Sequence, residues 1–101
     1  MPLYGRFGTI IARTGERDAL LAVLMEASRA APSMAGCRLY IVGAVLGHVD
    51  TIAVTEIWDD KASHTASLAL DSVRAMIARA RPLMAGAGPT TEFEPRAKFE
   101  R

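Results

Sequence analysis

The sequence predicts an α+β fold in which an antiparallel sheet carries helices on one face. Hydrophobic periodicity and turn signals give the element order β-α-β-β-α-α-β. When the two later helices are counted as one broken helix, this order is the split β-α-β plan of ferredoxin-like folds. The chain has 101 residues, half of them hydrophobic, which suits one globular domain. We therefore expect residues 1–101 to form a single domain.

The first half of the chain indicates a strand, a helix and a second strand. Residues 3–13 are rich in aromatic and β-branched side chains and end at a Thr-Gly turn signal, which is typical of a strand. Residues 16–31 place leucines and alanines on one helical stripe, and Pro32 ends the helix. After a loop at 33–36, the apolar run at 37–45 predicts the second strand.

The third strand and the helix after it are predicted most clearly. Residues 46–50 contain glycine and aspartate and indicate a hairpin connection. β-Branched residues dominate 51–58, which favours a strand. Asp59 or Asp60 can cap a short helix over 61–69, because an aspartate side chain accepts the free N–H groups of a first turn.

The last part of the chain predicts a second helix and a short final strand. The helix extends from Leu70 to about Met84, and Pro82 falls in its last turn. The glycine-rich stretch 85–89 indicates a loop, and 90–95 indicates a strand. We expect residues 95–101 to be a loose tail or to contact a neighbouring subunit.

Both faces of the predicted sheet are apolar, which a monomer with helices on one face does not need. In the third strand, two largely apolar sets alternate: Ile52, Val54 and Trp58 with Ala53, Thr55 and Ile57. The helices cover only one set. The other set needs a partner, and a second copy of the same sheet is the simplest one. We therefore expect a homodimer with its sheets packed face to face.

Charge and cysteine content exclude several classes of function. The net charge of +1, with arginines interleaved among acids, gives no electrostatic case for a nucleic acid or membrane partner. The single cysteine, Cys37, cannot form a disulfide within the chain, and no His-Cys-Asp cluster has metal-ligand spacing. No apolar run approaches the roughly 20 residues of a membrane helix, and no signal peptide is evident. We expect a cytoplasmic protein without a metal site.

The stretch EIWDDKASH, residues 56–64, holds the strongest candidates for a site. Strand alternation puts Glu56 and Trp58 on one face, and the capped helix turns His64 back toward the strand end. Each residue also has a structural interpretation: Trp58 as a core aromatic at a strand end, and His64 as a partly exposed helix residue. For Glu56 we favour an ion pair, with Arg6 as one candidate partner, over catalysis.

The motifs along the chain, taken in order, resemble one known family. They are Arg13-Thr14-Gly15, Pro32 followed by Gly36-Cys37, Glu56-x-Trp58 followed by acids and His64, the segment Arg81–Ala85, and Phe93-Glu94-Pro95. This order is similar to that of the antibiotic biosynthesis monooxygenase (ABM) domain, a dimeric α+β barrel. The resemblance covers nearly the whole chain.

The resemblance implies oxygenation of an electron-rich phenol, hydroquinone or polyketide aromatic without any cofactor. It also implies His64 as acid/base catalyst, because its position matches a tyrosine with that role in a polyketide-oxidising member, and Trp58 as the aromatic wall of the pocket. Tyr40, Val54 and Glu56 are then candidate substrate contacts, although Val54 replaces an asparagine of that member and Tyr40 fits the dimer interface equally well.

Three functions therefore stay open from the sequence. The leading hypothesis is a cofactor-independent monooxygenase for a small aromatic ligand. The others are a dimeric domain that binds a small hydrophobic molecule without catalysis, and an isomerase or lyase of the same barrel superfamily. Haem degradation is not expected, because Gly8 and Ile77 stand where haem-degrading relatives carry an asparagine and a histidine.

Overall fold

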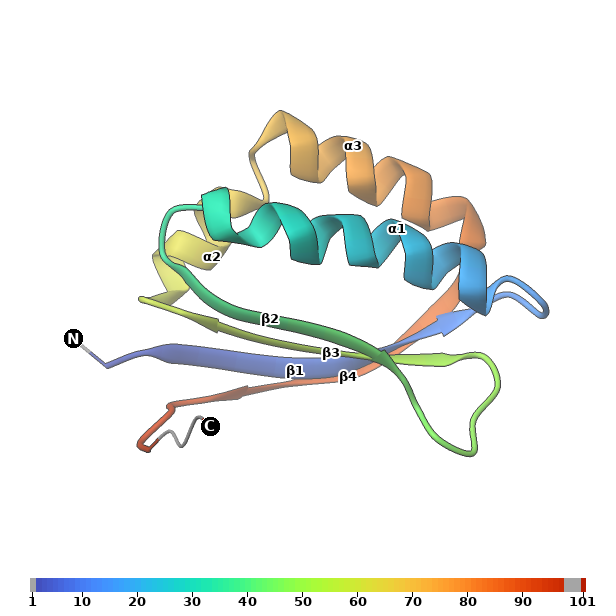
Figure 1. Cartoon of the computed structure of the whole chain (residues 1–101), viewed down its shortest axis with the longest axis horizontal. Helices are drawn as coiled ribbons and strands as arrows, with labels where there is room; N and C mark the ends of the chain where they lie inside the picture. Colours follow the sequence, from blue (N-terminus) through green and yellow to red (C-terminus); the bar gives the residue numbers. More distant parts are fainter. Residues whose placement is uncertain (1, 98–100) are drawn as a thin grey trace.

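A computed structural model shows one antiparallel sheet with helices on one face (Figure 1), which confirms the predicted fold class. The structure describes residues 2–97 and 101. Its elements are β1 (Tyr4–Ala12), α1 (Arg17–Ala30), β2 (Cys37–Ala44), β3 (Thr51–Trp58), α2 (Lys61–Ser67), α3 (Asp71–Ala80) and β4 (Met84–Phe93). Short 3-10 turns at Ala31–Ser33 and Arg81–Leu83 follow α1 and α3. In the described part of the chain, no helix is long and apolar enough to span a bilayer.

The strands lie in the order β2-β3-β1-β4, and every neighbouring pair is antiparallel. Strand β1 is therefore central and pairs with both β3 and β4. Helices α1 and α3 pack together above one face, and α2 lies at the end of β3 (Figure 1). Among the described residues, no helix covers the opposite face, which we call the open face.

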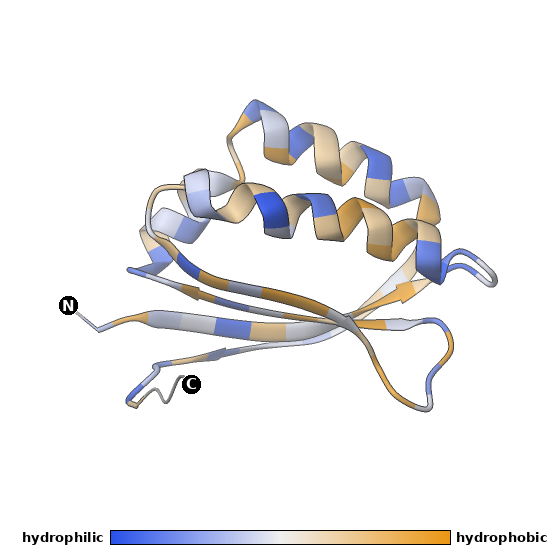
Figure 2. Ribbon diagram, viewed as in Figure 1, coloured by the Kyte–Doolittle hydropathy of each residue, from blue (hydrophilic) through white to orange (hydrophobic). Residues whose placement is uncertain are grey.

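The core lies between the sheet and helices α1 and α3. The predicted helical stripe is buried, with Leu20, Leu24 and Ala27 at the inner face of α1. From the sheet, Ile52 is fully buried and Trp58 is 1% exposed. In Figure 2, orange hydrophobic stretches alternate with blue hydrophilic ones along α1 and α3. Side chains therefore alternate along each strand between this core and the open face.

A tight corner joins β3 to α2 and positions the candidate histidine. Asp60 is the N-cap of α2, and its Oδ1 accepts a hydrogen bond from the Ser63 backbone N–H at 2.7 Å. The Asp59 N–H donates to the Gly36 carbonyl at 2.8 Å, which ties the start of β2 to this corner. Gly36 has φ +81°, and a Cβ there would lie 2.6 Å from Ser63 Oγ.

Two predicted boundaries in the last third of the chain are wrong. The stretch 85–89 is not a loop, because β4 begins at Met84 and pairs with β1 along its length. Pro89 is tolerated since β4 is an edge strand, and the pairing shifts register between Gly8 and Ile10. The last helix ends at Ala80 rather than Met84, because Pro82 cannot donate the next helical hydrogen bond.

The final strand ends at Phe93, two residues before the predicted end. Residues 95–97 of the predicted tail extend beyond β4 without regular structure, while residues 98–100 lie outside the described part of the chain. The tail's expected contact with a neighbouring subunit stays a prediction.

The packing of Gly36 against α2 gives a prediction about stability. Gly36→Ala should lower the free energy of unfolding by roughly 2–4 kcal/mol, because it combines a left-handed backbone strain with an overlap on Ser63. Gly47 has the same φ of +81° but open space around its Cβ. Gly47→Ala should therefore cost only about 1 kcal/mol. Urea unfolding measures both, and equal losses would show that the contact with α2 is unimportant.

Candidate functional site

A cavity of about 290 Å³ lies between the sheet and helices α1 and α3. Its apolar lining includes Ile10 and Val54 from the sheet, Leu24 from α1 and Met76 from α3. This volume lies near the lower end of the range for small-molecule sites. The cavity therefore suits a ligand about the size of one substituted aromatic ring.

The polar lining of the cavity gathers along its sheet side. It consists of Arg6, Thr9, Tyr40, Glu56 and Thr90. Arg6, Tyr40 and Glu56 come from adjacent strands, because Glu56 of β3 pairs with Arg6 on one side and with Tyr40 on the other. A few converging polar groups in an apolar chamber are the usual form of a ligand site.

The five residues proposed from the sequence occupy two different positions. Tyr40, Val54 and Glu56 all line the cavity. Trp58 and His64 lie against each other, with ring centroids 5.6 Å apart, but neither belongs to the cavity lining. They contact the polar wall through Glu56 and Arg6 instead.

Glu56 is a carboxylate held at the cavity wall by groups from β1 and β3. Its side chain is 15% exposed. Oε1 accepts a hydrogen bond from Trp58 Nε1–H at 3.1 Å, and Oε2 lies 3.8 Å from Arg6 Nε. The expected ion pair with Arg6 is thus confirmed. Burial raises the pKa of the Glu56 carboxyl, and the Trp58 hydrogen bond and the charge of Arg6 only partly offset this rise.

His64 is buried on α2, and its ring contacts fix its tautomer. Arg6 Nη1 lies 3.2 Å from His64 Nδ1. A guanidinium only donates, so Nδ1 must accept, and the imidazole carries its hydrogen on Nε2. That Nε2 lies 3.9 Å from Glu56 Oε1. Burial first, and then the charge of Arg6, lowers the pKa of His64, so the ring is neutral at pH 7.

Arg6 also connects the cavity wall to the protein surface. Its Nη1 donates to the Tyr4 hydroxyl at 3.3 Å, and that hydroxyl donates to Glu92 Oε2 at 2.7 Å. Lys61 of α2 completes the chain with an ion pair to Glu92 at 2.9 Å. Sequence reasoning did not single out Tyr4, Glu92 or Lys61. The Tyr-x-Arg spacing puts Tyr4 and Arg6 on one face of β1, and it was the one available sign of this cluster. It points to Glu92 only when the pairing of β4 with β1 is known.

Tyr40 faces the cavity, which the sequence had left undecided. Burial and then the nearby Glu56 raise the pKa of the Tyr40 phenol to about 12. The phenol is therefore neutral and can donate a hydrogen bond to a ligand. Burial likewise raises the pKa of the half-buried Cys37 thiol, which disfavours the reactive thiolate. Within residues 2–97 and 101, no group of three or more His, Cys, Asp or Glu side chains is arranged to hold a metal ion.

The lowered pKa of His64 gives a prediction about pH-dependent stability. The unfolded chain binds a proton at this position more readily than the folded protein, so stability should fall as the pH drops below the ordinary pKa of 6.5. His64→Gln should reduce the loss of stability between about pH 7.5 and about pH 5.5. Urea unfolding at both pH values measures this loss of stability for the wild type and the variant.

The second histidine provides the control for this experiment. His48 is exposed on the hairpin between β2 and β3. His48→Gln should therefore leave the pH dependence of the free energy of unfolding as it is in the wild type. If His64→Gln and His48→Gln give the same pH dependence as the wild type, protonation of His64 does not contribute to acid unfolding.

Comparison with known proteins agrees with this fold. The sequence pattern of the antibiotic biosynthesis monooxygenase family matches residues 5–79. A candidate antibiotic biosynthesis monooxygenase from Chloroflexus aurantiacus J-10-fl is 42% identical, with a TM-score of 0.88 and 97% coverage of both chains. A candidate monooxygenase of the same description from Caulobacter crescentus CB15 is 18% identical over 95% of this chain and 92% of its own, with a TM-score of 0.85.

A protein from Pseudomonas aeruginosa shares the fold at 18% identity, with a TM-score of 0.85 and coverage of 96% of this chain and 97% of its own. Among proteins with curated descriptions, none matches the chain. The family pattern covers three quarters of the chain, and the C. aurantiacus protein extends the likeness over almost all of it. The chain belongs to the antibiotic biosynthesis monooxygenase family.

Proposed function

We propose that this protein is a cofactor-independent monooxygenase that oxidises a small phenol, hydroquinone or polyketide-type aromatic with dioxygen. Family membership supports the reaction class. The observation that carries the proposal is the cavity, an apolar chamber whose polar wall places a guanidinium, a carboxylate and a neutral phenol on adjacent strands. Such a wall suits a ligand with an apolar ring and a hydroxyl group.

The reaction begins with ionisation of the ligand hydroxyl at the polar wall. The aromatic ring lies between Val54 and Met76, and its oxygen faces Arg6. An anionic phenolate is rich in electrons, and the guanidinium stabilises it beside the apolar lining of the cavity. The phenolate passes one electron to dioxygen, and the phenoxyl radical and superoxide recombine to a peroxide anion. The proton that the wall took from the hydroxyl returns to this anion, and loss of water from the resulting hydroperoxide gives the quinone.

The roles that the sequence suggested for Trp58 and His64 stay predictions. Support for them is indirect, because both residues contact the cavity wall rather than the cavity. Trp58 donates to Glu56, and His64 accepts from Arg6. A ligand-binding domain or an isomerase would use the same chamber, so the use of dioxygen separates these alternatives from the proposed oxygenase.

We expect oxygen uptake and quinone formation when the purified protein is supplied with a panel of hydroquinones. An oxygen electrode measures the oxygen uptake, and absorbance measures the quinone. Anaerobic samples serve as blanks. Val54→Phe should lower kcat/KM about tenfold or more, because the larger ring fills the cavity. Val49→Phe places the same substitution on the exposed hairpin and should leave the rate unchanged. Tight phenol binding without oxygen uptake would favour the non-catalytic binding domain.

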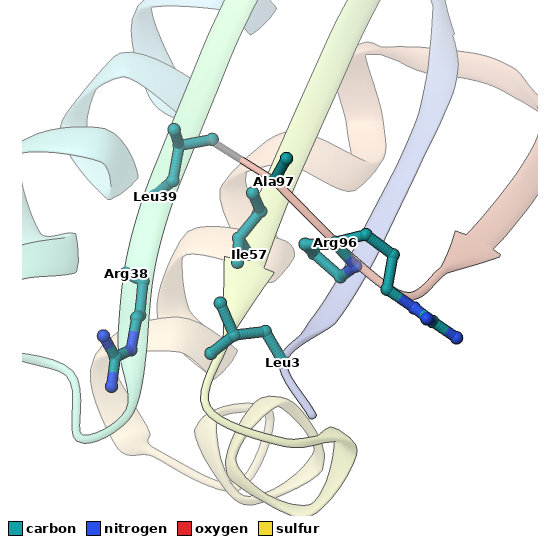
Figure 3. A pocket seen from close by; sticks show the side chains of 7 residues that line it. Leu3, Arg38, Leu39, Ile57, Arg96 and Ala97 are labelled. Atoms are coloured by element: carbon teal, nitrogen blue, oxygen red, sulfur yellow. The ribbon is translucent and has the colours of Figure 1, made fainter. Parts of the chain in front are cut away.

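We also propose that the open face of the sheet is the interface of a homodimer. Large apolar side chains project from three of its strands: Phe7, Ile41 and Phe93, which are 49%, 57% and 37% exposed. A Cβ on Gly5 would overlap the end of the Phe93 ring, so this glycine leaves room for the ring beside β1. Leu3, Leu39 and Ile57 add a pocket of about 330 Å³ at the end of the same face, beside residues 95–97 (Figure 3).

Charge on the open face should therefore change the oligomeric state. The wild type should sediment as a dimer at micromolar concentration, and Ile41→Glu should shift it toward monomer, because a carboxylate would be buried without a partner. Met25→Glu changes an exposed apolar residue on α1, on the helix side of the sheet, and should stay dimeric. A wild-type protein that sediments as a monomer would refute the proposed interface.

A further inference from the structure

We propose that Glu56, rather than His64, takes the hydroxyl proton of the aromatic ligand, and that Arg6 holds the oxyanion that results. This inference rests on the proposed function, because it names the proton acceptor of the same site. It assigns a catalytic role to a residue for which the sequence favoured a structural ion pair.

Position is the first argument for Glu56. Its side chain borders the cavity, whereas His64 contacts the wall from outside the lining. Oε1 of Glu56 already accepts from Trp58 Nε1–H. Oε2 lies 3.8 Å from Arg6 Nε, which is an ion-pair separation longer than a hydrogen bond, so this oxygen keeps a lone pair for a ligand hydroxyl.

The tautomer of His64 is the second argument. Its Nδ1 accepts from the Arg6 guanidinium, and its Nε2 carries the ring hydrogen. Neither nitrogen therefore has a free lone pair for a ligand proton. Protonation at Nδ1 would also place an imidazolium against a guanidinium at a separation of 3.2 Å. In this arrangement His64 is a positioning residue that orients Arg6.

The charge balance is the third argument. In the transfer, the ligand O–H bond breaks, its electron pair stays on the ligand oxygen, and a new O–H bond forms at Glu56 Oε2. One negative charge moves from the carboxylate to the ligand oxygen, and both face Arg6. The net charge of the chamber is unchanged, so no uncompensated ion is created in a low-dielectric site. The burial that raises the pKa of Glu56 also makes it a stronger base.

The chain offers a matched control for Glu56. Arg6 lies between two carboxylates, since its partner on β3 is Glu56 and its partner on β4 is Glu92. Glu92 does not belong to the cavity lining and is held by Tyr4 and Lys61. Glu92→Gln therefore removes the same charge from the other side of Arg6, without changing the wall of the cavity.

The test uses 4-nitrophenol without oxygen, in weakly buffered solution at a pH below the pKa of the free probe. Its phenolate absorbs in the visible range, and a pH indicator reports protons released to the solvent. In the wild type the phenolate band should appear without proton release, because the protein takes the proton. Glu56→Gln should bind the neutral phenol, or bind the phenolate and release one proton for each probe bound.

The two other variants decide between Glu56 and the alternatives. Glu92→Gln and His64→Gln should form the phenolate without proton release, as the wild type does. The proposal is overturned if Glu56→Gln also forms the phenolate without proton release. It is likewise overturned if His64→Gln releases one proton for each phenolate bound, or if the wild type binds only the neutral probe. Circular dichroism confirms that each variant is folded.

Measuring quinol oxidation by the same variants distinguishes a failure of this inference from a failure of the proposed function. If quinols are oxidised, Glu56→Gln should lower kcat/KM about 100-fold or more, because general bases contribute about that much. His64→Gln should lower it about tenfold and retain the pH profile of the wild type. If no quinol is oxidised, but the wild type forms the phenolate without proton release and Glu56→Gln does not, the oxygenase proposal fails and the assignment of Glu56 stands.

Discussion

The guanidinium of Arg6 is the group to which the other polar side chains at the cavity wall are joined. It is always charged and can only donate, so His64 accepts through Nδ1. Burial first, and then the charge of Arg6, lowers the pKa of His64 and keeps its ring neutral at pH 7. The same cation lies near Glu56 and opposes the rise in pKa that burial causes there. One side chain thus couples a carboxylate, an imidazole and, through Tyr4, a surface ion pair. Without it, the Glu56 carboxylate would lose its ion pair with Arg6, and His64 Nδ1 would lose its hydrogen-bond donor.

The fold can hold this cation because β1 is central in the sheet. Arg6 has a strand on each side, each strand contributes a carboxylate at the same level, and α2 brings an imidazole over the end. The alternation of β1 sends Tyr4 and Arg6 toward the helices, and Phe7 toward the open face. Gly8 follows on the helix side and lines the cavity, where a larger side chain would crowd Thr90. The strand therefore provides both the charge and part of the space for a ligand.

Local patterns in the sequence predicted much of this arrangement. Period-two alternation placed Glu56 and Trp58 on one face, and the aspartate cap turned the α2 histidine toward them, as observed. Patterns could not show that His64 would lie behind Arg6, since that depends on side-chain direction and on the pairing of β1 with β3. The start of β4 was missed for a similar reason. Glycines and a proline normally indicate a loop, and only pairing with β1 makes them a strand.

Trp58 shows why structural and functional interpretations of one residue need not compete. At 1% exposure it is a core residue, and its indole packs edge-on against His64. The same indole donates its single hydrogen bond to Glu56 Oε1. Because that bond stabilises the charged carboxylate, a core residue lowers the basicity of Glu56 and partly offsets the effect of burial on its pKa. The position of the indole therefore decides both how the core packs and how Glu56 is hydrogen-bonded. This explains how the end of one strand contributes to the core and to the site together.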